Sequence, residues 1–241
     1  MKLSIVIPAY NEQNTIEELI RRVEAADIGS LMKEIIVVDD GSRDSTREIL
    51  ARFPNIHYIF HEKNLGKGGA VKTGFRNATG DIVLIQDADL EYDPNDYLAM
   101  IQPIIDRKTE ITLGVRIQPE RDARRQKSLY WLSWVGNKLI TLVTNWLYWN
   151  NAGEYEGCYK AFTRGLILSI DIETNDFDFD NELICKILRK GYRTVDVPIR
   201  YHPRSYEQGK KINWKHGVKI LGTIMKWRFR RIKKGPAVGQ T

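Results

Sequence analysis

Five short apolar segments in the first half of the chain alternate with segments of helical pattern, and this alternation restricts the possible folds more than any other feature. The strand-like segments are LSIVIP (3–8), EIIVVDD (34–40), IHYIFH (56–61), DIVLIQD (81–87) and EITLGVR (110–116). Their apolar runs are continuous, as expected for strands buried on both faces of a parallel sheet. The sequence therefore predicts an α/β fold with a mostly parallel, Rossmann-like sheet flanked by helices.

Two of the intervening segments carry recognisable helix starts. After Thr15 the apolar residues recur every three to four positions, which indicates a helix with one buried face. Thr15 with Glu18, and Ser45 with Glu48, have the spacing of capping boxes. We expect a capped helix at both places.

The size and composition of the chain suit one domain. Its 241 residues, 42% of them apolar, can bury a substantial core. The two cysteines, Cys158 and Cys185, cannot form a disulfide framework and are expected to be reduced packing residues, which favours the cytoplasm. No cleavable signal and no uninterrupted run of about 18 apolar residues is evident, so we expect neither secretion nor a membrane span.

The C-terminal part of the chain is strongly basic. No acidic residue follows Glu207, whereas ten lysines and arginines do, and the rest of the chain has 27 basic and 31 acidic side chains. Such a tail suits an anionic surface, either lipid or nucleic acid, or it is simply a solvated terminus.

The segment 121–150 is rich in tryptophan and begins with basic residues. It predicts two amphipathic helices with an aromatic face. These helices could pack on the core or lie at a bilayer interface, where tryptophan and tyrosine rings are favoured.

Polar and charged residues follow four of the predicted strands. PAYNE follows the first strand, DDGSRD the second, DADLE the fourth and GVR the fifth. Ligands of open parallel sheets bind beyond the carboxyl ends of the strands. The sequence therefore predicts a functional site at that edge of the sheet.

Three acids, Asp87, Asp89 and Glu91, stand close together after the fourth strand, with the small Ala88 between the first two. On an extended chain all three would point to the same side and could hold one Mg²⁺ or Mn²⁺ ion, which prefers carboxylates together with substrate phosphates. The alternative is that they are helix-capping acids before a turn at Asp93.

The other strand-end residues suit a nucleoside. Asp40 and Glu12 can accept hydrogen bonds from a base or ribose, and Tyr10 can stack on a base. The glycine-rich segment 64–75 matches neither a P-loop nor a dinucleotide fingerprint. It predicts either close packing at a helix start or direct ligand contact.

The motifs VIPAYNE, IIVVDDGSRDST, NLGKGGAVKTGF, GDIVLIQDADLEYDP and GVR, in this order, resemble those of glycosyltransferase family 2. The later segments GCYKAF and FDFDNELICKILRKGYRTVDVPIRYHPRSYEQGKK resemble its dolichyl-phosphate mannose synthase-like branch. The resemblance implies a GT-A fold with amphipathic interface helices and a basic C-terminal helix. It also implies transfer of a hexose from a nucleotide sugar to a polyprenyl phosphate.

The resemblance divides the single domain, 1–241, into a nucleotide-sugar-binding half (1–116), an acceptor half (117–212) and a basic amphipathic tail (213–241). The site residues that it implies fall into four groups. Pro8, Tyr10, Glu12, Val38 and Asp40 would line the nucleoside pocket; Asp87 and Ala88 would contact the donor; Asp89 and Glu91 would hold the metal; Arg116, Arg204 and Lys210 would bind phosphates.

Two features depart from the branch. Glu91 stands where glutamine is frequent, and AGEYEGCYK replaces a DMETCYK-type segment. These departures leave the sugar and the nucleotide open between GDP-mannose and UDP-glucose.

The implied reaction is an inverting displacement by an acceptor oxygen. A dolichyl or undecaprenyl phosphate is already ionised near neutral pH and needs no strong base. A saccharide hydroxyl, the alternative acceptor in polysaccharide or glycan synthesis, would need one, for which Asp180 and Glu182 are candidates, unless they are simply helix-start acids.

The expected partners are the donor, the polyprenyl phosphate and an anionic membrane surface, with a membrane protein as a further candidate. The expected location is the cytoplasm, at the periphery of the inner membrane face. Nucleic-acid binding through the tail would leave the acidic strand ends unexplained, so no nucleic-acid partner is expected.

Overall fold

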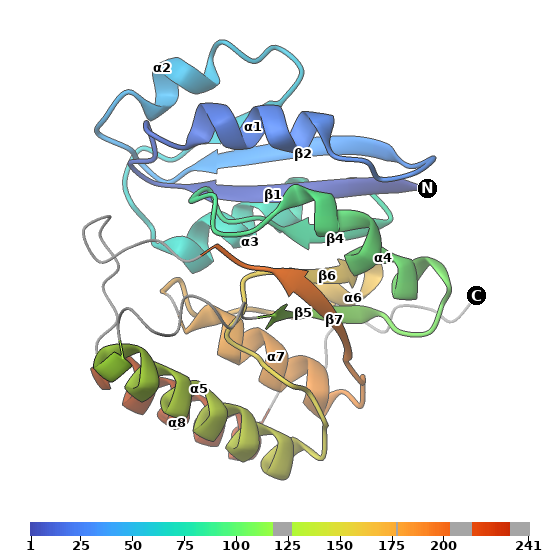
Figure 1. Cartoon of the computed structure of the whole chain (residues 1–241), viewed down its shortest axis with the longest axis vertical. Coiled ribbons are helices and arrows are strands. Elements are labelled where there is room, and N and C mark those ends of the chain that lie inside the picture. Colours follow the sequence, from blue (N-terminus) through green and yellow to red (C-terminus); the bar gives the residue numbers. More distant parts are fainter. Residues whose placement is uncertain (118–126, 177, 203–213, 232–241) are drawn as a thin grey trace.

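The computed structural model describes residues 1–117, 127–176, 178–202 and 214–231. Within them, seven strands form one mixed sheet in the order β3-β2-β1-β4-β6-β5-β7 (Figure 1). The strands are β1 (Lys2–Ala9), β2 (Met32–Asp39), β3 (His57–Phe60), β4 (Ile82–Ile85), β5 (Ile111–Ile117), β6 (Lys160–Thr163) and β7 (Val195–Arg200). All neighbours are parallel except β6, which is antiparallel to β4 and β5. The five predicted strands and the mostly parallel sheet are confirmed.

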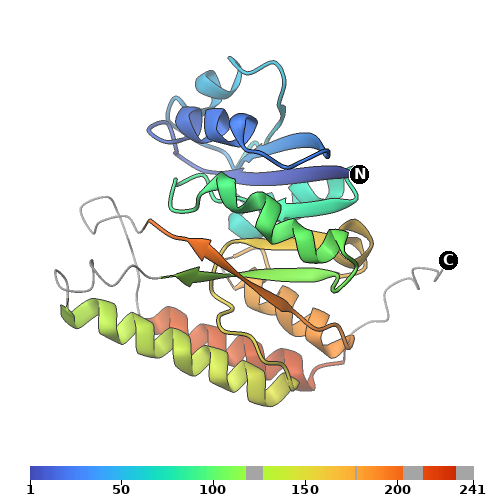
Figure 2. The ribbon, with the colours of Figure 1, turned by 45° about the vertical axis from the view of Figure 1, so that its right-hand side comes forward.

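Helices cover both faces of the sheet. They are α1 (Ile16–Ala25), α2 (Thr46–Leu50), α3 (Lys67–Asn77), α4 (Tyr97–Ile105), α5 (Lys127–Tyr148), α6 (Arg164–Leu168), α7 (Phe179–Arg189) and α8 (Trp214–Phe229), with a 3₁₀ turn at Pro94–Asp96. α3 packs against β1 and β2, whereas α4 packs against β5, β6 and β7. Figure 2 shows α4 in front of the sheet and α3 behind it. The central strands β1 and β4 are consequently buried on both sides.

Neither predicted capping box forms, although both helices do. Thr15 and Ser45 make no side-chain cap to their helices. The Thr15 hydroxyl donates to the Glu12 carboxylate (2.6 Å), and the backbone N–H of Thr46 donates to Asp44 instead (3.0 Å). A charged oxygen is a stronger hydrogen-bond acceptor than a neutral one. The carboxylates of Glu12 and Asp44 therefore bind these donors, and the capping boxes do not form.

One helix, α5, occupies the tryptophan-rich segment, so the expectation of two helices there was wrong within the described residues. α5 and α8 lie side by side at the opposite end of the molecule from α1 and α2 (Figures 1 and 2). α8 also packs on α7. Ile224 and Trp227 form its buried face, whereas Val218 and Met225 are exposed.

Two further expectations from the sequence can be compared with the structure. Cys158 and Cys185 are both buried free thiols, as expected for packing residues. Among the described helices, none combines the length and apolar character that crossing a bilayer requires.

Candidate active site

A cavity of about 430 Å³ lies at the carboxyl ends of β1, β2 and β4, where the polar strand ends predicted it. Residues after three strands and the first turn of α3 form its wall. They are Pro8, Ala9, Tyr10, Glu12, Asp40, Asn64, Gly66, Lys67, Ala70, Asp87, Ala88 and Asp89. Seven of the predicted nucleotide-sugar residues therefore line one cavity. Val38 does not, because its side chain is fully buried in β2.

The charged pair in this wall joins Lys67 to Asp87. The Lys67 Nζ lies 2.6 Å from Asp87 Oδ1. Burial alone would raise the pKa of Asp87, but the Lys67 ammonium holds this pKa below its usual value. Burial opposes the charge of Lys67 in the same way, and Asp87 keeps the pKa of Lys67 well above its usual value. Both groups are therefore ionised at neutral pH.

Lys67 is not among the site residues that the sequence predicted. It is the first residue of α3, directly after Gly66, so its ammonium lies beside the N-terminus of an eleven-residue helix. Both the ammonium and the helix dipole favour an anion there. A lysine inside a glycine-rich helix start is the sequence signal that could have indicated this role.

The three acids after β4 do not form the expected row. The strand ends at Ile85 and the chain turns at residues 88–90, with Leu90 at φ 62°. Asp87, Asp89 and Glu91 are therefore not on one extended strand, and the prediction that all three point to the same side for that reason was wrong. Glu91 instead accepts a hydrogen bond from the Tyr201 hydroxyl (2.9 Å). Within the described ranges, no three Asp, Glu, His or Cys side chains gather closely enough to hold a metal ion.

The remaining donor set still suits a hard divalent cation. Asp87 and Asp89 both line the cavity. Mg²⁺ is commonly bound by one or two carboxylates together with substrate phosphates and water. Asp87 and Asp89 would supply the protein's share of such a site once a diphosphate enters.

Asp40 serves the structure around the cavity. Its carboxylate accepts from the backbone N–H groups of Leu65 (2.9 Å) and Gly66 (2.8 Å) and lies 2.7 Å from His61 Nδ1. These partners occupy its oxygens. Asp40 thus fixes the turn that leads into α3, which limits the role expected for it as an acceptor from base or ribose.

The glycines of that turn are needed for packing. Gly66 has φ 90°, and a Cβ there would lie 2.5 Å from the backbone oxygen of Asn175. A Cβ at Gly68 would lie 2.8 Å from Phe179 Cβ. Gly66 also lines the cavity. For segment 64–75 the sequence predicted either close packing or direct ligand contact, and Gly66 combines close packing with a position in the cavity wall.

Arg116 lies outside the cavity wall. It forms an ion pair with Glu154, and its guanidinium stacks over the Tyr201 ring at 4.8 Å. Arg204 and Lys210, the other predicted phosphate ligands, lie outside the described residues.

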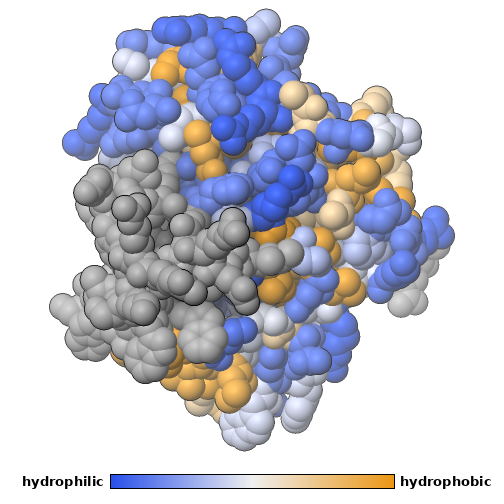
Figure 3. All heavy atoms as spheres, in the orientation of Figure 1, coloured by the Kyte–Doolittle hydropathy of each residue, from blue (hydrophilic) through white to orange (hydrophobic). Residues whose placement is uncertain are grey.

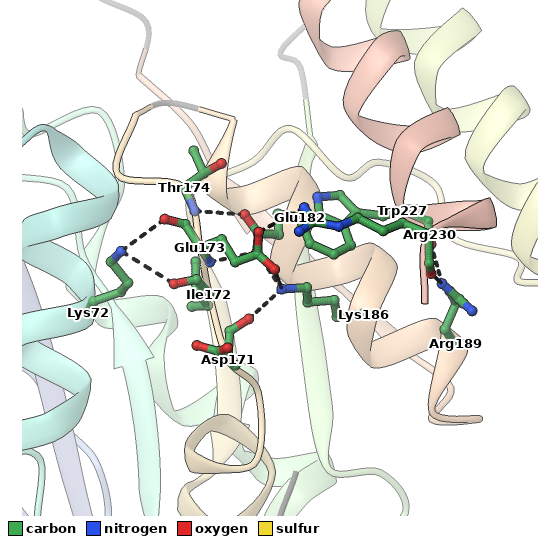
Figure 4. Close-up of polar contacts among 10 residues, drawn as sticks. All are labelled: Lys72, Asp171, Ile172, Glu173, Thr174, Glu182, Lys186, Arg189, Trp227 and Arg230. Carbon is green, nitrogen blue, oxygen red and sulfur yellow. Dashed lines mark hydrogen bonds and ion pairs between the residues drawn. The ribbon is translucent and has the colours of Figure 1, made fainter. Parts of the chain in front are cut away.

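Glu182, a predicted catalytic base, is completely buried, and both of its carboxylate oxygens accept hydrogen bonds (Figure 4). Its two oxygens accept from the backbone N–H groups of Glu173 (2.7 Å) and Thr174 (2.9 Å) and from Lys186 Nζ (2.6 Å). Although burial alone would raise it, these donors lower the pKa of Glu182. Glu182 is thus a structural anchor at the start of α7. The other candidate, Asp180, pairs with Lys160 at 3.1 Å.

Solved structures with the same architecture identify the fold. Glucosyl-3-phosphoglycerate synthase from Mycobacterium tuberculosis, in complex with Mg²⁺ and uridine diphosphate, superimposes with a TM-score of 0.72 at 17% identity. The match covers 94% of this chain and 79% of that chain. The protein therefore has the GT-A fold of glycosyltransferases.

The family follows from the sequence match. The model of glycosyl transferase family 2 matches residues 4–167, and the chain belongs to that family. Residues 4–167 thus form a glycosyltransferase family 2 domain, as the motifs predicted.

Curated relatives include transferases named for polyprenyl phosphates. Undecaprenyl-phosphate 4-deoxy-4-formamido-L-arabinose transferase of Salmonella paratyphi A is 30% identical over 87% of this chain and 62% of its own length. UDP-N-acetylglucosamine–dolichyl-phosphate N-acetylglucosaminyltransferase of Methanococcus voltae is 25% identical over 95% of this chain and 96% of its own length. Glycosyltransferase AglD of Haloferax volcanii is 28% identical over 85% of this chain. The chain spans 34% of AglD and less than two thirds of the Salmonella enzyme.

Proposed function

We propose that the protein transfers a hexose from GDP-mannose or UDP-glucose to a dolichyl or undecaprenyl phosphate, with inversion and with Mg²⁺ or Mn²⁺. The observation that carries this proposal is the cavity at the strand ends, whose wall combines Lys67 with Asp87 and Asp89. The relatives named for undecaprenyl and dolichyl phosphates support the acceptor class.

The wall residues would share the work on the donor. Lys67 and the N-terminus of α3 would bind the diphosphate, and Asp87 and Asp89 would hold the cation beside it. A bound Mg²⁺ or Mn²⁺ would neutralise negative charge on the diphosphate as it leaves. Tyr10 and Glu12, on the wall after β1, would contact the nucleoside.

A phosphate acceptor agrees with the state of the predicted bases. Glu182 is buried and held by three donors, and Asp180 is paired with Lys160. Neither is arranged to take a proton from a hydroxyl. A phosphate monoester, whose second pKa is about 6, does not need such a base. Arg116, Arg204 and Lys210 stay proposed ligands of the phosphates.

The lipid acceptor calls for a membrane surface, and the α5–α8 face suits one. We define this face by its exposed large apolar side chains, which are Leu139, Leu142, Trp146, Trp149, Val218, Met225 and Phe229. Figure 3 shows hydrophobic surface at the lower left, over α5. Arg228 stacks over Trp149 at 5.3 Å, so cations border the apolar side chains. Basic residues near an anionic bilayer contribute about 1 kcal/mol each.

This face would hold the enzyme at the inner surface of the cytoplasmic membrane, alone or beside a membrane protein. Nucleotide sugars and reduced thiols are both expected on that side.

The decisive assay incubates purified protein with Mn²⁺, radiolabelled GDP-mannose or UDP-glucose, and vesicles that contain undecaprenyl or dolichyl phosphate. We expect lipid-linked sugar from one of the donors. Asp89→Asn should abolish transfer, whereas Asp106→Asn, which changes a carboxylate directly after α4 that pairs with Lys108, should not. Transfer to a soluble saccharide, with none to lipid, would overturn the acceptor assignment.

A further inference from the structure

A short stretch between α6 and α7, residues 171–176, packs behind the glycine turn of α3 that lines the cavity, and we call it the backing segment. The backbone N–H of Gly69 donates to the backbone oxygen of Asn175 (3.1 Å), and Gly66 packs against the same oxygen too closely for a side chain. Lys72 Nζ reaches Ile172 O (3.3 Å) and the Asn175 side chain. Gly66, Lys67 and Ala70 line the cavity. The position of the backing segment therefore sets the position of this wall.

The opposite side of the backing segment is held by buried charges of α7 (Figure 4). Glu182 accepts from the backbone N–H groups of Glu173 and Thr174. Lys186 Nζ donates to Glu182 and to the backbone oxygen of Asp171, and its side chain is only 4% exposed. A buried ammonium and a buried carboxylate are costly unless each keeps all its partners. The backing segment is thus tied firmly to α7.

α8 completes this network from outside. The Trp227 ring covers Lys186, with Nζ 3.8 Å from the ring centroid. Lys219 pairs with Asp176 (2.6 Å) and with Asp178 (3.1 Å). α8 consequently touches the backing segment directly as well as through α7.

Two more contacts come from the same helix. The Thr223 hydroxyl donates to Asp178 (3.1 Å), and Arg230, directly after the helix, pairs with Glu173 (2.8 Å). Asp176, Asp178 and Glu173 flank or belong to the backing segment, so contacts along the length of α8 converge on it.

We propose that α8 is a positioning helix for the donor cavity: through the backing segment it sets the glycine turn of α3, so that seating of α8 and binding of a nucleoside diphosphate favour each other. The proposal rests on the proposed function for its ligand. Coupling of two sites is reciprocal, so whatever seats α8 strengthens donor binding, and the donor stabilises α8. Because α8 carries part of the α5–α8 face, contact of that face with a membrane would strengthen donor binding.

The test changes one contact of α8 and measures nucleotide binding. Lys219→Glu places a third carboxylate beside Asp176 and Asp178, and both Lys219 and Asp176 are largely exposed, so the fold should survive. We expect the Kd of GDP or UDP with Mn²⁺, measured by calorimetry, to rise at least about fivefold. Adding Asp176→Lys to this variant should restore the Kd to within about twofold of the wild-type value.

Arg228→Glu is the matched control. It makes the same charge change on α8, but the rings that Arg228 stacks on are those of Trp149 and Phe229, which have no described contact with the backing segment, so it should leave the Kd unchanged. Lys72→Met is a second test, because it removes the side-chain hydrogen bonds of α3 to the backing segment without touching α8. It should also weaken nucleotide binding. In turnover assays the donor KM should rise for Lys219→Glu and for Lys72→Met, while the acceptor KM stays constant. General destabilisation of the fold would not produce this selective change.

Hydrogen exchange supplies the reciprocal measurement. Nucleotide with Mn²⁺ should slow exchange of the amides in α8 and in the backing segment of the wild-type protein. If nucleotide binds but α8 exchange and the Kd of Lys219→Glu are both unchanged, the positioning role is refuted and the proposed function stands. If the wild-type protein binds neither GDP nor UDP, the proposed function itself fails.

Discussion

Lys67 and Asp87 keep opposite charges together in the wall of the cavity. Each would be costly to bury alone, and their 2.6 Å contact allows both to stay ionised. The diphosphate and cation of the proposed function would offer each of them a new partner of the right sign. The pair could then open without leaving either charge unneutralised.

Replacing Lys67 by Met tests this at the level of one side chain. A hydrogen bond to a charged group is worth about 1.5 to 3 kcal/mol, so the Kd of GDP or UDP with Mn²⁺ should rise on the order of tenfold to a hundredfold. Lys63→Met, an exposed lysine outside the cavity wall, is the control. Calorimetry that finds equal affinities for Lys67→Met and wild type would mean that Lys67 only neutralises Asp87.

Glu156 gives the protein a pH-dependent stability. Its Oε1 is buried without a hydrogen-bond partner, and burial raises the pKa of Glu156 to about 7. An unfolded glutamate ionises near pH 4.3. Between these two values the unfolded state loses a proton that the folded state retains, so this residue's contribution to stability falls as the pH rises.

Glu156→Gln cannot ionise and should remove that dependence. Its melting temperature should match wild type near pH 4 and exceed it near pH 8, where the gain in unfolding free energy is at most about 4 kcal/mol. Thermal melts across this range provide the measurement. A difference between the two proteins that does not change with pH would contradict the assignment.

At the scale of elements, α5 and α8 have two different faces. Trp227 and Ile224 of α8 are buried against the core, whereas Trp146 of α5 and Trp149 directly after it are each 75% exposed. Large exposed aromatic side chains gathered on one side of a molecule indicate an interaction surface. Arg228, which stacks over Trp149, borders these side chains and favours an anionic partner surface.

The double change Leu142→Gln and Trp146→Gln should reduce binding to anionic vesicles about tenfold or more, since each full burial of such a side chain contributes about 1.5 to 3 kcal/mol. Both side chains are exposed, so the melting temperature should change little. Met32→Gln, an exposed apolar residue of β2, serves as the control in the same sedimentation assay. Undiminished vesicle binding by the double variant would exclude this part of the α5–α8 face.

At the scale of the whole molecule, the two predicted halves of the chain share one sheet. β6, from the acceptor half, lies between β4 and β5 of the nucleotide-sugar-binding half, and β7 forms the edge beyond β5. Neither half can complete its own sheet.

A chain ending at Arg116 should therefore fail to fold. It would expose the edge of β4 and leave β5 without its neighbours, and open edges of apolar strands promote aggregation. Soluble yield and circular dichroism measure the outcome, with a chain ending at Arg231 as the control. A soluble, cooperatively melting 1–116 fragment would show that the first half is a domain of its own.

Local patterns in the sequence determined the strands, the edge of the sheet that carries the site, and most of the cavity wall. Continuous apolar runs define buried parallel strands, and the residues directly after them must meet at one edge because the strands run the same way. Pro8, Tyr10, Glu12, Asp87 and Asp89 could be predicted for this reason.

Tertiary contacts decided the roles of the remaining charges. Glu182 became an anchor through Lys186 and the amides of the backing segment, Glu91 a partner of Tyr201, and Lys67 the partner of Asp87. The pattern around each residue shows its charge but not the donor that will reach it, because the free energy of a buried charge depends on neighbours that are distant in sequence.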